Sequence, residues 1–272
     1  MTWLSKFRRP PSPPEGLGPV LLFSYGITRS GSTLAYLMAH FALELAGCRQ
    51  PSLPGHRGRV NFVPRLDQVR IDMLSSIAND INAPLVVKLP NGPKGPATEL
   101  LRNGRAKAHV IVRDPRDIAL SLIDRGTAAR KNNMKAFSEV HNLADAKASI
   151  DNQMPKLLRW LKQPGILRLD YSELVFNGDR SIQRILDHIG IAGDVDRIHH
   201  AIRKSGRAKP VTAQQDRYRA AMSGEDQAWF EAAYKPFYDH VMPAERTNFD
   251  DIDDLKSPRC ASMITPPSLR KT

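Results

Sequence analysis

The sequence contains very little cysteine and no long apolar segment. Only two of its 272 residues are cysteines, Cys48 and Cys260, which are too few and too scattered for a disulfide framework or a metal site. No apolar stretch approaches the ~18 residues that a membrane-spanning helix needs. The N-terminus likewise has no apolar core of signal-peptide length. These absences predict a cytoplasmic protein with free thiols and no bound metal.

Acidic residues are scarce relative to basic ones. Twenty-eight Asp and Glu stand against 40 Lys and Arg, which gives a formal net charge of +12. Such an excess implies an anionic ligand, an anionic macromolecule or a membrane surface as partner. The basic residues are spread along the chain without a long basic run, so we expect no nucleic-acid partner. A weak contact between the basic N-terminus and an anionic membrane surface stays open.

Residues 19–38 combine a strand pattern, a glycine-bounded loop and a helix pattern. Residues 20–23 form a short apolar run that is typical of a buried parallel strand. A polar turn leads to Gly31, and apolar residues at helical spacing follow Ser32. This layout predicts an anion cradle, because loop amides and a helix N-terminus both point donors at an anion.

The register of the glycines separates this loop from a nucleotide-hydrolysing one. Gly26 and Gly31 fit the first six positions of a P-loop, but Ser32 and Thr33 stand where a P-loop has Lys and then Ser or Thr. A cation is supplied instead by Arg29, whose planar guanidinium suits the oxygens of a phosphate or sulfate. We therefore expect an anion cradle that does not serve ATP hydrolysis.

The remaining chain alternates strand and helix patterns. Further strands are expected at 85–89, 108–112 and 166–169, and helices at 66–81, 97–103, 115–130, 134–161, 171–175, 181–189, 195–204 and 225–241. Alternation of this kind predicts a parallel α/β sheet layered by helices. In such sheets ligands bind outside the carboxyl ends of the strands.

One domain is expected, with an extension at each end. The α/β domain is placed at residues 19–246, after a basic, proline-rich leader at 1–18 and before a tail at 247–272. The loop at 47–64 has no periodicity and is long enough to suggest a role at the mouth of a site.

A second anion-binding pattern, VIVRDPRDIALSLI, occupies residues 110–123. The strand end delivers Arg113, and Ser121 lies about two turns into the following helix, so both converge on one anion if the helix folds back along the strand. The alternative that the residues leave open is an Arg113–Asp117 ion pair with Asp114 capping the helix.

The two patterns together resemble a known family. TRSGST after the first strand and VRDPRDIALSL about eighty residues later are similar to the two signature elements of the sulfotransferases, which take a sulfuryl group from 3′-phosphoadenosine 5′-phosphosulfate (PAPS). The resemblance implies a P-loop NTPase-like three-layer fold with a central parallel sheet flanked by helices. It assigns the 5′-phosphosulfate to Arg29, Ser30, Gly31, Ser32 and Thr33. It assigns the 3′-phosphate to Arg113 and Ser121.

Two shorter stretches extend the resemblance. Residues 167–174 are similar to a strand-then-helix element of the family, and Arg203, Lys204 and Gly206 stand where the family has a basic, glycine-containing loop that closes over the nucleotide. An ordinary strand end and a solvated basic loop are the alternative interpretations.

The catalytic groups are less clearly marked. Sulfuryl transfer needs positive charge on the bridging and sulfuryl oxygens and no metal, which makes Arg29 and Lys88 candidates. Many family members have a His two residues after this lysine, and this chain has Pro90 there. The general base is therefore open, with Glu44 as the first candidate and His40 and His56 as alternatives.

The sequence thus predicts a PAPS-dependent sulfotransferase acting on a hydroxyl or amine of a small-molecule, sugar or lipid acceptor. A P-loop small-molecule kinase is one alternative, although it would need a lysine at position 32 and an acidic magnesium ligand. A non-catalytic nucleotide- or polyanion-binding protein is the other, because the usual histidine is missing. The oligomeric state stays open.

Overall fold

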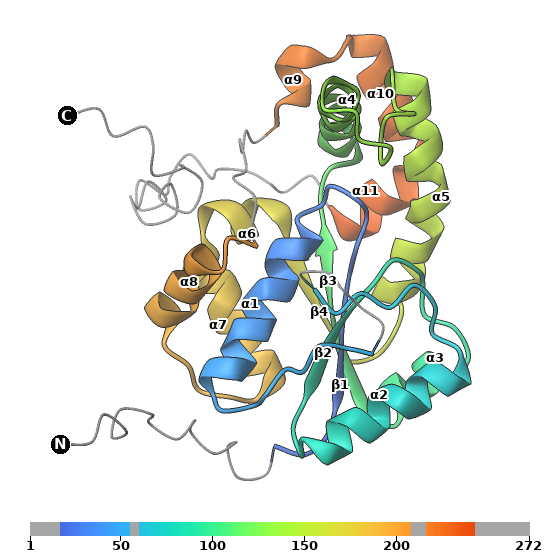
Figure 1. The fold of residues 1–272 in the computed structure, drawn as a ribbon. Helices are drawn as coiled ribbons and strands as arrows, with labels where there is room; N and C mark the ends of the chain where they lie inside the picture. Colours follow the sequence, from blue (N-terminus) through green and yellow to red (C-terminus); the bar gives the residue numbers. More distant parts are fainter. Residues whose placement is uncertain (1–16, 55–59, 208–215, 243–272) are drawn as a thin grey trace, which may run out of the picture.

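The structure is a computed structural model that describes residues 17–54, 60–207 and 216–242 (Figure 1). The predicted leader, apart from its last two residues, the tail, His56 and Cys260 lie outside the described residues. Cys48 is buried and forms no disulfide.

In the described ranges, four strands form one parallel sheet. They are β1 (Leu21–Gly26), β2 (Leu85–Leu89), β3 (Ala106–Val112) and β4 (Ile166–Asp170). Their order is β2-β1-β3-β4, and every pair runs parallel. All four lie where the sequence predicts a strand; β1, β2 and β3 are mostly buried apolar runs, whereas the edge strand β4 is half-buried apart from its buried Leu169.

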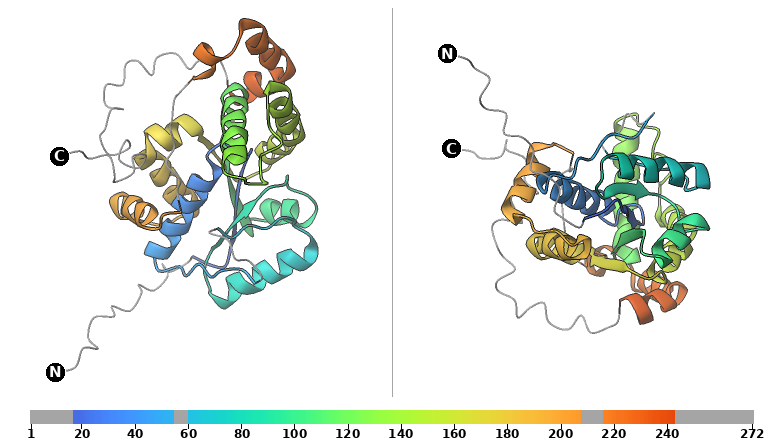
Figure 2. Two further views of the ribbon diagram at one scale, coloured as in Figure 1. Left: turned by 45° about the horizontal axis from the view of Figure 1, so that its top comes forward. Right: turned by 90° about the horizontal axis from the view of Figure 1, so that it is seen from below.

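Helices cover both faces of the sheet and make three layers (Figures 1 and 2). One face packs against α1 (Ser32–Leu45), α6 (Tyr171–Phe176), α7 (Gly178–Ile189) and α8 (Val195–Lys204). The other packs against α2 (Gln68–Asp80), α3 (Pro96–Arg102) and α5 (Leu143–Leu161). The same cluster of buried residues extends to α4 (Pro115–Lys131), α9 (Tyr218–Ala221), α10 (Gly224–Ala233) and α11 (Lys235–Val241). This arrangement confirms the predicted α/β class.

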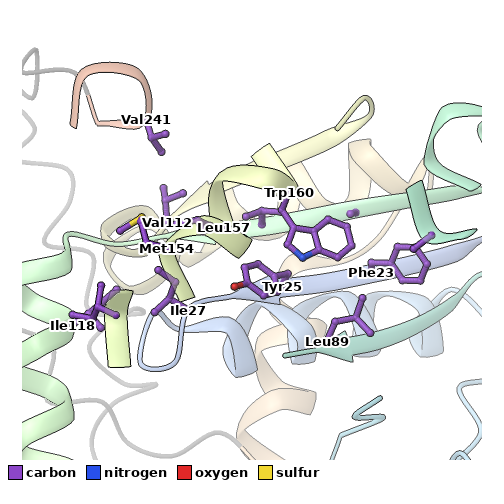
Figure 3. Packing of buried hydrophobic residues seen from close by; sticks show 14 of the residues in the cluster. Phe23, Tyr25, Ile27, Leu89, Val112, Ile118, Met154, Leu157, Trp160 and Val241 are labelled. Carbon is purple, nitrogen blue, oxygen red and sulfur yellow. The ribbon is translucent and has the colours of Figure 1, made fainter. Parts of the chain in front are cut away.

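Trp160 on α5 fixes the larger core against the central strand. Its ring stacks on Tyr25 with centroids 5.7 Å apart and meets Phe23 edge-on at 5.9 Å (Figure 3). The indole Nε1 donates a hydrogen bond of 2.9 Å to Asn91 O, which satisfies its buried polar atom. This packing holds α5 against β1, the strand that leads into the glycine-bounded loop.

The helix expected at 134–161 begins later, at Leu143. Asn142 ends the non-helical segment by capping the helix, since its side chain accepts a hydrogen bond from Asp145 N. Residues 132–142 form turns instead, with Asn133 and Phe137 at positive φ. The segment is mostly polar and has no apolar periodicity. The prediction of a helix was therefore wrong for residues 134–142.

The helix expected at 225–241 is divided into α10 and α11. Tyr234 separates them, and Pro236 occupies the first turn of α11. Proline has no N–H to continue a helix, which explains why the chain restarts there. The short helix α9 was not predicted.

Candidate active site

The loop between β1 and α1 is a tight turn with an arginine in an unusual backbone conformation. Ser30 N donates to Ile27 O at 2.9 Å, and Arg29 between them has a φ of 74°. A non-glycine residue in this left-handed region is strained and persists only where its surroundings hold it. The loop thus places a guanidinium where a glycine would be the ordinary choice.

Both glycines of the loop are required by close packing. A Cβ on Gly26 would lie 2.5 Å from Ser30 Oγ, and one on Gly31 would lie 2.9 Å from the ring of Tyr171. Gly31 also has a φ of 89°. Ser30 is fully buried, and its Oγ has no hydrogen-bond partner among the described residues. A buried polar atom of this kind needs a partner, which fits a loop shaped for a polar ligand.

A glutamine on α5 anchors the loop from the side. Gln153 Oε1 accepts hydrogen bonds of 2.9 Å from both Thr28 N and Thr28 Oγ1. Its Nε2 donates to Ser149 O at 3.0 Å, so the amide is fixed on its own helix. This residue could not be predicted from the sequence, because a single glutamine in a polar helix carries no pattern.

The second motif folds onto the first. Arg29 Nε donates to Ser121 Oγ at 3.1 Å, and Arg113 Nη1 donates to Arg29 O at 2.9 Å. Helix α4 lies across the carboxyl end of β1 and does not fold back along a strand, and this placement still brings Arg113 and Ser121 to the loop. Arg29 thus meets two residues that follow it by more than eighty positions, at the carboxyl ends of β1 and β3.

The alternative interpretation of the second motif holds in part. Asp114 does cap α4, since its side chain accepts from Arg116 N at 2.9 Å, and it pairs with the Arg116 guanidinium. Asp117 forms no ion pair with Arg113 within 4.0 Å and instead accepts a hydrogen bond of 3.1 Å from Tyr218 N. Arg113 is thus left to face the loop.

Tyr171 connects Arg113 with the loop. The Arg113 guanidinium carbon lies 3.8 Å from the centre of the Tyr171 ring, which itself packs where a Cβ of Gly31 would be. Tyr171 is the first residue of α6, at the end of β4. It belongs to the 167–174 stretch, so the weaker resemblance contained a signal for it.

Positive charge is concentrated at the loop between β1 and α1. Burial lowers the pKa of Arg29, and the nearby charges of Arg113 and then Arg125 lower it further. Burial also lowers the pKa of Arg113. Guanidinium groups that destabilise one another's charge are stabilised by an anion between them. The electrostatics of the site therefore favour an anionic ligand.

Lys88 reaches the same cradle from β2. Its Nζ donates to Thr33 Oγ1 in the first turn of α1 at 2.6 Å, and burial lowers its pKa to about 8. The backbone of Lys88 also pairs with a neighbouring segment, since its N donates to Asn61 O and its O accepts from Val63 N. Lys88 thus lies at the first turn of α1, next to the loop that carries Arg29, and its catalytic role stays a prediction.

Glu44 is not brought to this cluster. From Ser32 to Glu44 the helix α1 rises ~18 Å at 1.5 Å per residue, so the carboxylate lies at the far end of the helix. There Glu44 Oε2 is 3.5 Å from His40 Nε2. Burial raises the pKa of Glu44 and lowers that of His40 to about 4. The two residues form an i, i+4 contact within α1 and are not neighbours of the loop.

The basic segment at the end of α8 also lies apart. Arg203, Lys204 and Gly206 are exposed at the C-terminal end of α8, on the outer side of α1 (Figure 1). Arg207 Nη1 approaches His40 Nε2 to 3.3 Å, which places the segment beside the middle of α1. The predicted closure of this segment over the nucleotide stays a prediction, since the residues from 208 to 215 lie outside the described ranges.

Comparisons with known proteins identify the family. The sulfotransferase domain family matches residues 20–257, so this chain belongs to that family and is a sulfotransferase. No curated protein matches the sequence. Membership confirms the predicted class of reaction, sulfuryl transfer.

Solved structures share the fold. Retinol dehydratase in a complex with retinol and PAP is 17% identical, with a TM-score of 0.51 and 82% of each chain covered. A mouse sulfotransferase complexed with PAP is 14% identical, with a TM-score of 0.49, 82% of this chain and 85% of that chain covered. At these identities the first likeness shows the fold, and it confirms the predicted P-loop-like three-layer architecture.

Two features are absent from the described residues. In the described ranges no helix is both long and apolar enough to cross a bilayer. The same residues contain no group of three or more His, Cys, Asp or Glu side chains arranged to hold a metal ion. The cytoplasmic location stays a prediction.

Proposed function

We propose that the protein moves a sulfuryl group from PAPS to a hydroxyl or amine of an acceptor. The observation that carries this proposal is the meeting of Arg29, Arg113 and Ser121 at the ends of two neighbouring strands. The donor has phosphate groups at two positions, which suits two adjacent anion sites. The PAP in the structures of retinol dehydratase and the mouse sulfotransferase supports this choice of donor.

The residues of the loop fit the 5′ end of such a donor. The backbone amides at the start of α1 are free to bind an anion, because those of Gly31, Ser32 and Thr33 have no carbonyl partner in the turn or in α1. The amide of Ser30 forms only the turn bond to Ile27 O. The unpartnered Oγ of Ser30 adds a hydroxyl. Arg113 and Ser121 are then left for the 3′-phosphate.

The chemistry places demands on Arg29 and Lys88. As the acceptor oxygen or nitrogen bonds to sulfur, the bond from sulfur to the bridging oxygen breaks and negative charge grows on the leaving phosphate. Preorganised cations stabilise that charge better than water does. Lys88, with its Nζ on Thr33, and Arg29, with its backbone fixed on both sides, are held at the cradle before the donor arrives.

The acceptor's proton must pass to a base that is not among the predicted ones described here. Glu44 and His40 pair with each other far along α1, so we propose that they stabilise the contact of α1 with α8 and take no proton from the acceptor. The small-molecule, sugar or lipid acceptor expected from the sequence remains a proposal, and retinol in the neighbouring dehydratase is compatible with it.

Two substitutions test the assignment of the donor sites. Arg29→Ala should abolish transfer, because it removes charge at the breaking bond, whereas Arg113→Ala should mainly weaken donor binding. The measurement is transfer from labelled PAPS, with the PAP dissociation constant of each variant determined separately. Equal and negligible effects of the two substitutions would mean that the sites are misassigned.

A further inference from the structure

A third arginine stands beside the proposed donor site. Arg125 follows Ser121 by four residues in α4, and residues at this spacing lie on one face of a helix with ~5–6 Å between their Cβ atoms. Helical side chains also lean toward the N-terminus of their helix, which directs Arg125 back toward Ser121. Ser121 Oγ accepts a hydrogen bond from Arg29 Nε. Arg125 therefore lies next to this pair, one helical turn further along α4.

The contacts of Arg125 with other described residues are weak ones. Its Nη2 lies 3.9 Å from Met134 Sδ, and its guanidinium carbon lies 5.7 Å from the centre of the Phe137 ring. A thioether is a weak acceptor, and 5.7 Å is close to the limit of a cation–π interaction. The side chain is half-buried. A guanidinium in such surroundings ordinarily has a carboxylate partner.

No carboxylate of the described residues forms an ion pair with Arg125. Its sequence neighbour Asp124 is already taken, since both carboxylate oxygens bind the guanidinium of Arg217. Arg29, to which Arg125 is close enough to act on its pKa, carries the same charge. The surroundings of Arg125 therefore add positive charge rather than compensate it.

The apolar contacts of Arg125 are held rigidly. Arg130 Nη1 donates to Ser138 O at 3.0 Å and to Val140 O at 2.7 Å, which ties the 132–142 segment to α4. A Cβ at Gly126 would lie 2.0 Å from Val140 O, so the segment approaches α4 as closely as a glycine allows. This holds Met134 and Phe137 as a fixed wall beside Arg125, where reduced access of water strengthens the attraction of an anion.

We propose that Arg125 binds an acidic group of the acceptor, so that the acceptor carries a carboxylate, sulfate or phosphate besides its hydroxyl or amine. The inference rests on the proposed function, in which Arg29, Arg113 and Ser121 serve the donor. The guanidinium of Arg125 is then the cation left over beside the cradle. An acidic acceptor also agrees with the net charge of +12.

Binding of matched acids and esters to the PAP-saturated protein tests this. Suitable pairs are 3-hydroxybenzoate, N-acetyltyrosine and glucuronate, each against its methyl ester, with dissociation constants from calorimetry. At least one acid should bind roughly tenfold or more tightly than its ester, as expected for a hydrogen bond to a charged group. Arg125→Met, which keeps the apolar length, should reduce that ratio to within about twofold.

Two controls keep the result interpretable. Lys131→Met removes an exposed cation from the same helix and should leave the acid preference unchanged. PAP should bind Arg125→Met about as tightly as it binds the wild type. Acids that bind no better than their esters, or a loss of PAP affinity in Arg125→Met, would overturn the inference. Failure of the wild type to bind PAP would instead contradict the proposed donor.

Discussion

At the scale of single residues, Arg29 shows how strain and charge are combined. A non-glycine residue in the left-handed region costs roughly 1–2 kcal/mol, yet the loop places its arginine there with φ at 74°. Three contacts hold it: the turn bond of Ser30, the bond from Arg113 to its carbonyl, and its own bond to Ser121. The contacts of Arg29 therefore offset the strain of its backbone at this site.

Arg29→Gly separates these two effects. We expect the variant to gain up to about 1 kcal/mol in the free energy of unfolding, because glycine adopts this φ without strain, and to lose sulfuryl transfer with the guanidinium. Urea unfolding and the transfer assay measure the two quantities. Arg29→Ala is the control, since it removes the guanidinium and keeps the strain. A glycine variant that retains transfer would show that Arg29 is not catalytic.

The lowered pKa of Lys88 predicts that the rate of the reaction depends on pH. Burial lowers its pKa from the ordinary 10.5 to about 8, so the lysine loses its charge as the pH rises through 8. Transfer that needs the charged form should fall above that pH with the slope of one proton. Lys88→Arg keeps its charge over this range and should remove the decline. An unchanged alkaline limb in the arginine variant would exclude Lys88 as its source.

At the scale of elements, the loop between β1 and α1 is held by α5. The bonds from Thr28 to Gln153 join the loop to a helix whose core residue Trp160 packs on β1. Both ends of this connection are fixed, so α5 determines where the loop lies. Gln153 touches no reacting group in our proposal and is a positioning residue.

Substitutions at Gln153 test that role. Gln153→Met removes the acceptor with little change of length and should lower kcat about tenfold, since misplacing Arg29 affects the transition state more than the ground state. The KM for the donor should change less. Gln153→Glu can still accept from Thr28 and should recover part of kcat. Equal losses in kcat and stability in both variants would indicate a structural role alone.

The sequence was informative wherever the signal is local. The four strands are short apolar runs, and the two donor motifs are continuous stretches, so both could be predicted. Gln153 could not, because its role depends on a helix more than a hundred residues away from the loop. Glu44 was misplaced for a related reason: proximity in sequence to the loop does not shorten the ~18 Å of helix between them.

At the scale of the whole molecule, buried histidines make the free energy of unfolding depend on pH. His109 lies on β3 beside Ser24 of β1, is fully buried, and finds no partner for either ring nitrogen among the described residues. Burial lowers its pKa to about 3, and it lowers that of His188 to about 4. The folded protein therefore keeps these rings neutral at pH values where the unfolded chain protonates them.

The free energy of unfolding should consequently fall as the pH drops below 6.5 toward 3. In that window the unfolded state binds more protons than the folded state, which is the condition for stability to rise with pH. His109→Leu should reduce the slope, whereas His240→Gln, at an exposed position, should not. Urea unfolding at a series of pH values measures this. Identical slopes in the wild type and His109→Leu would contradict the assignment.

The binding of PAPS compared with that of ATP and magnesium tests the central proposal most directly. Arg29 replaces the cation of a nucleotide P-loop, and Ser32 stands where its lysine would be, so the wild type should bind labelled PAPS without metal. Arg113→Ala should weaken that binding, and ATP with magnesium should not compete at comparable concentrations. If PAPS failed to bind and ATP with magnesium bound instead, the assignment of the donor would be wrong.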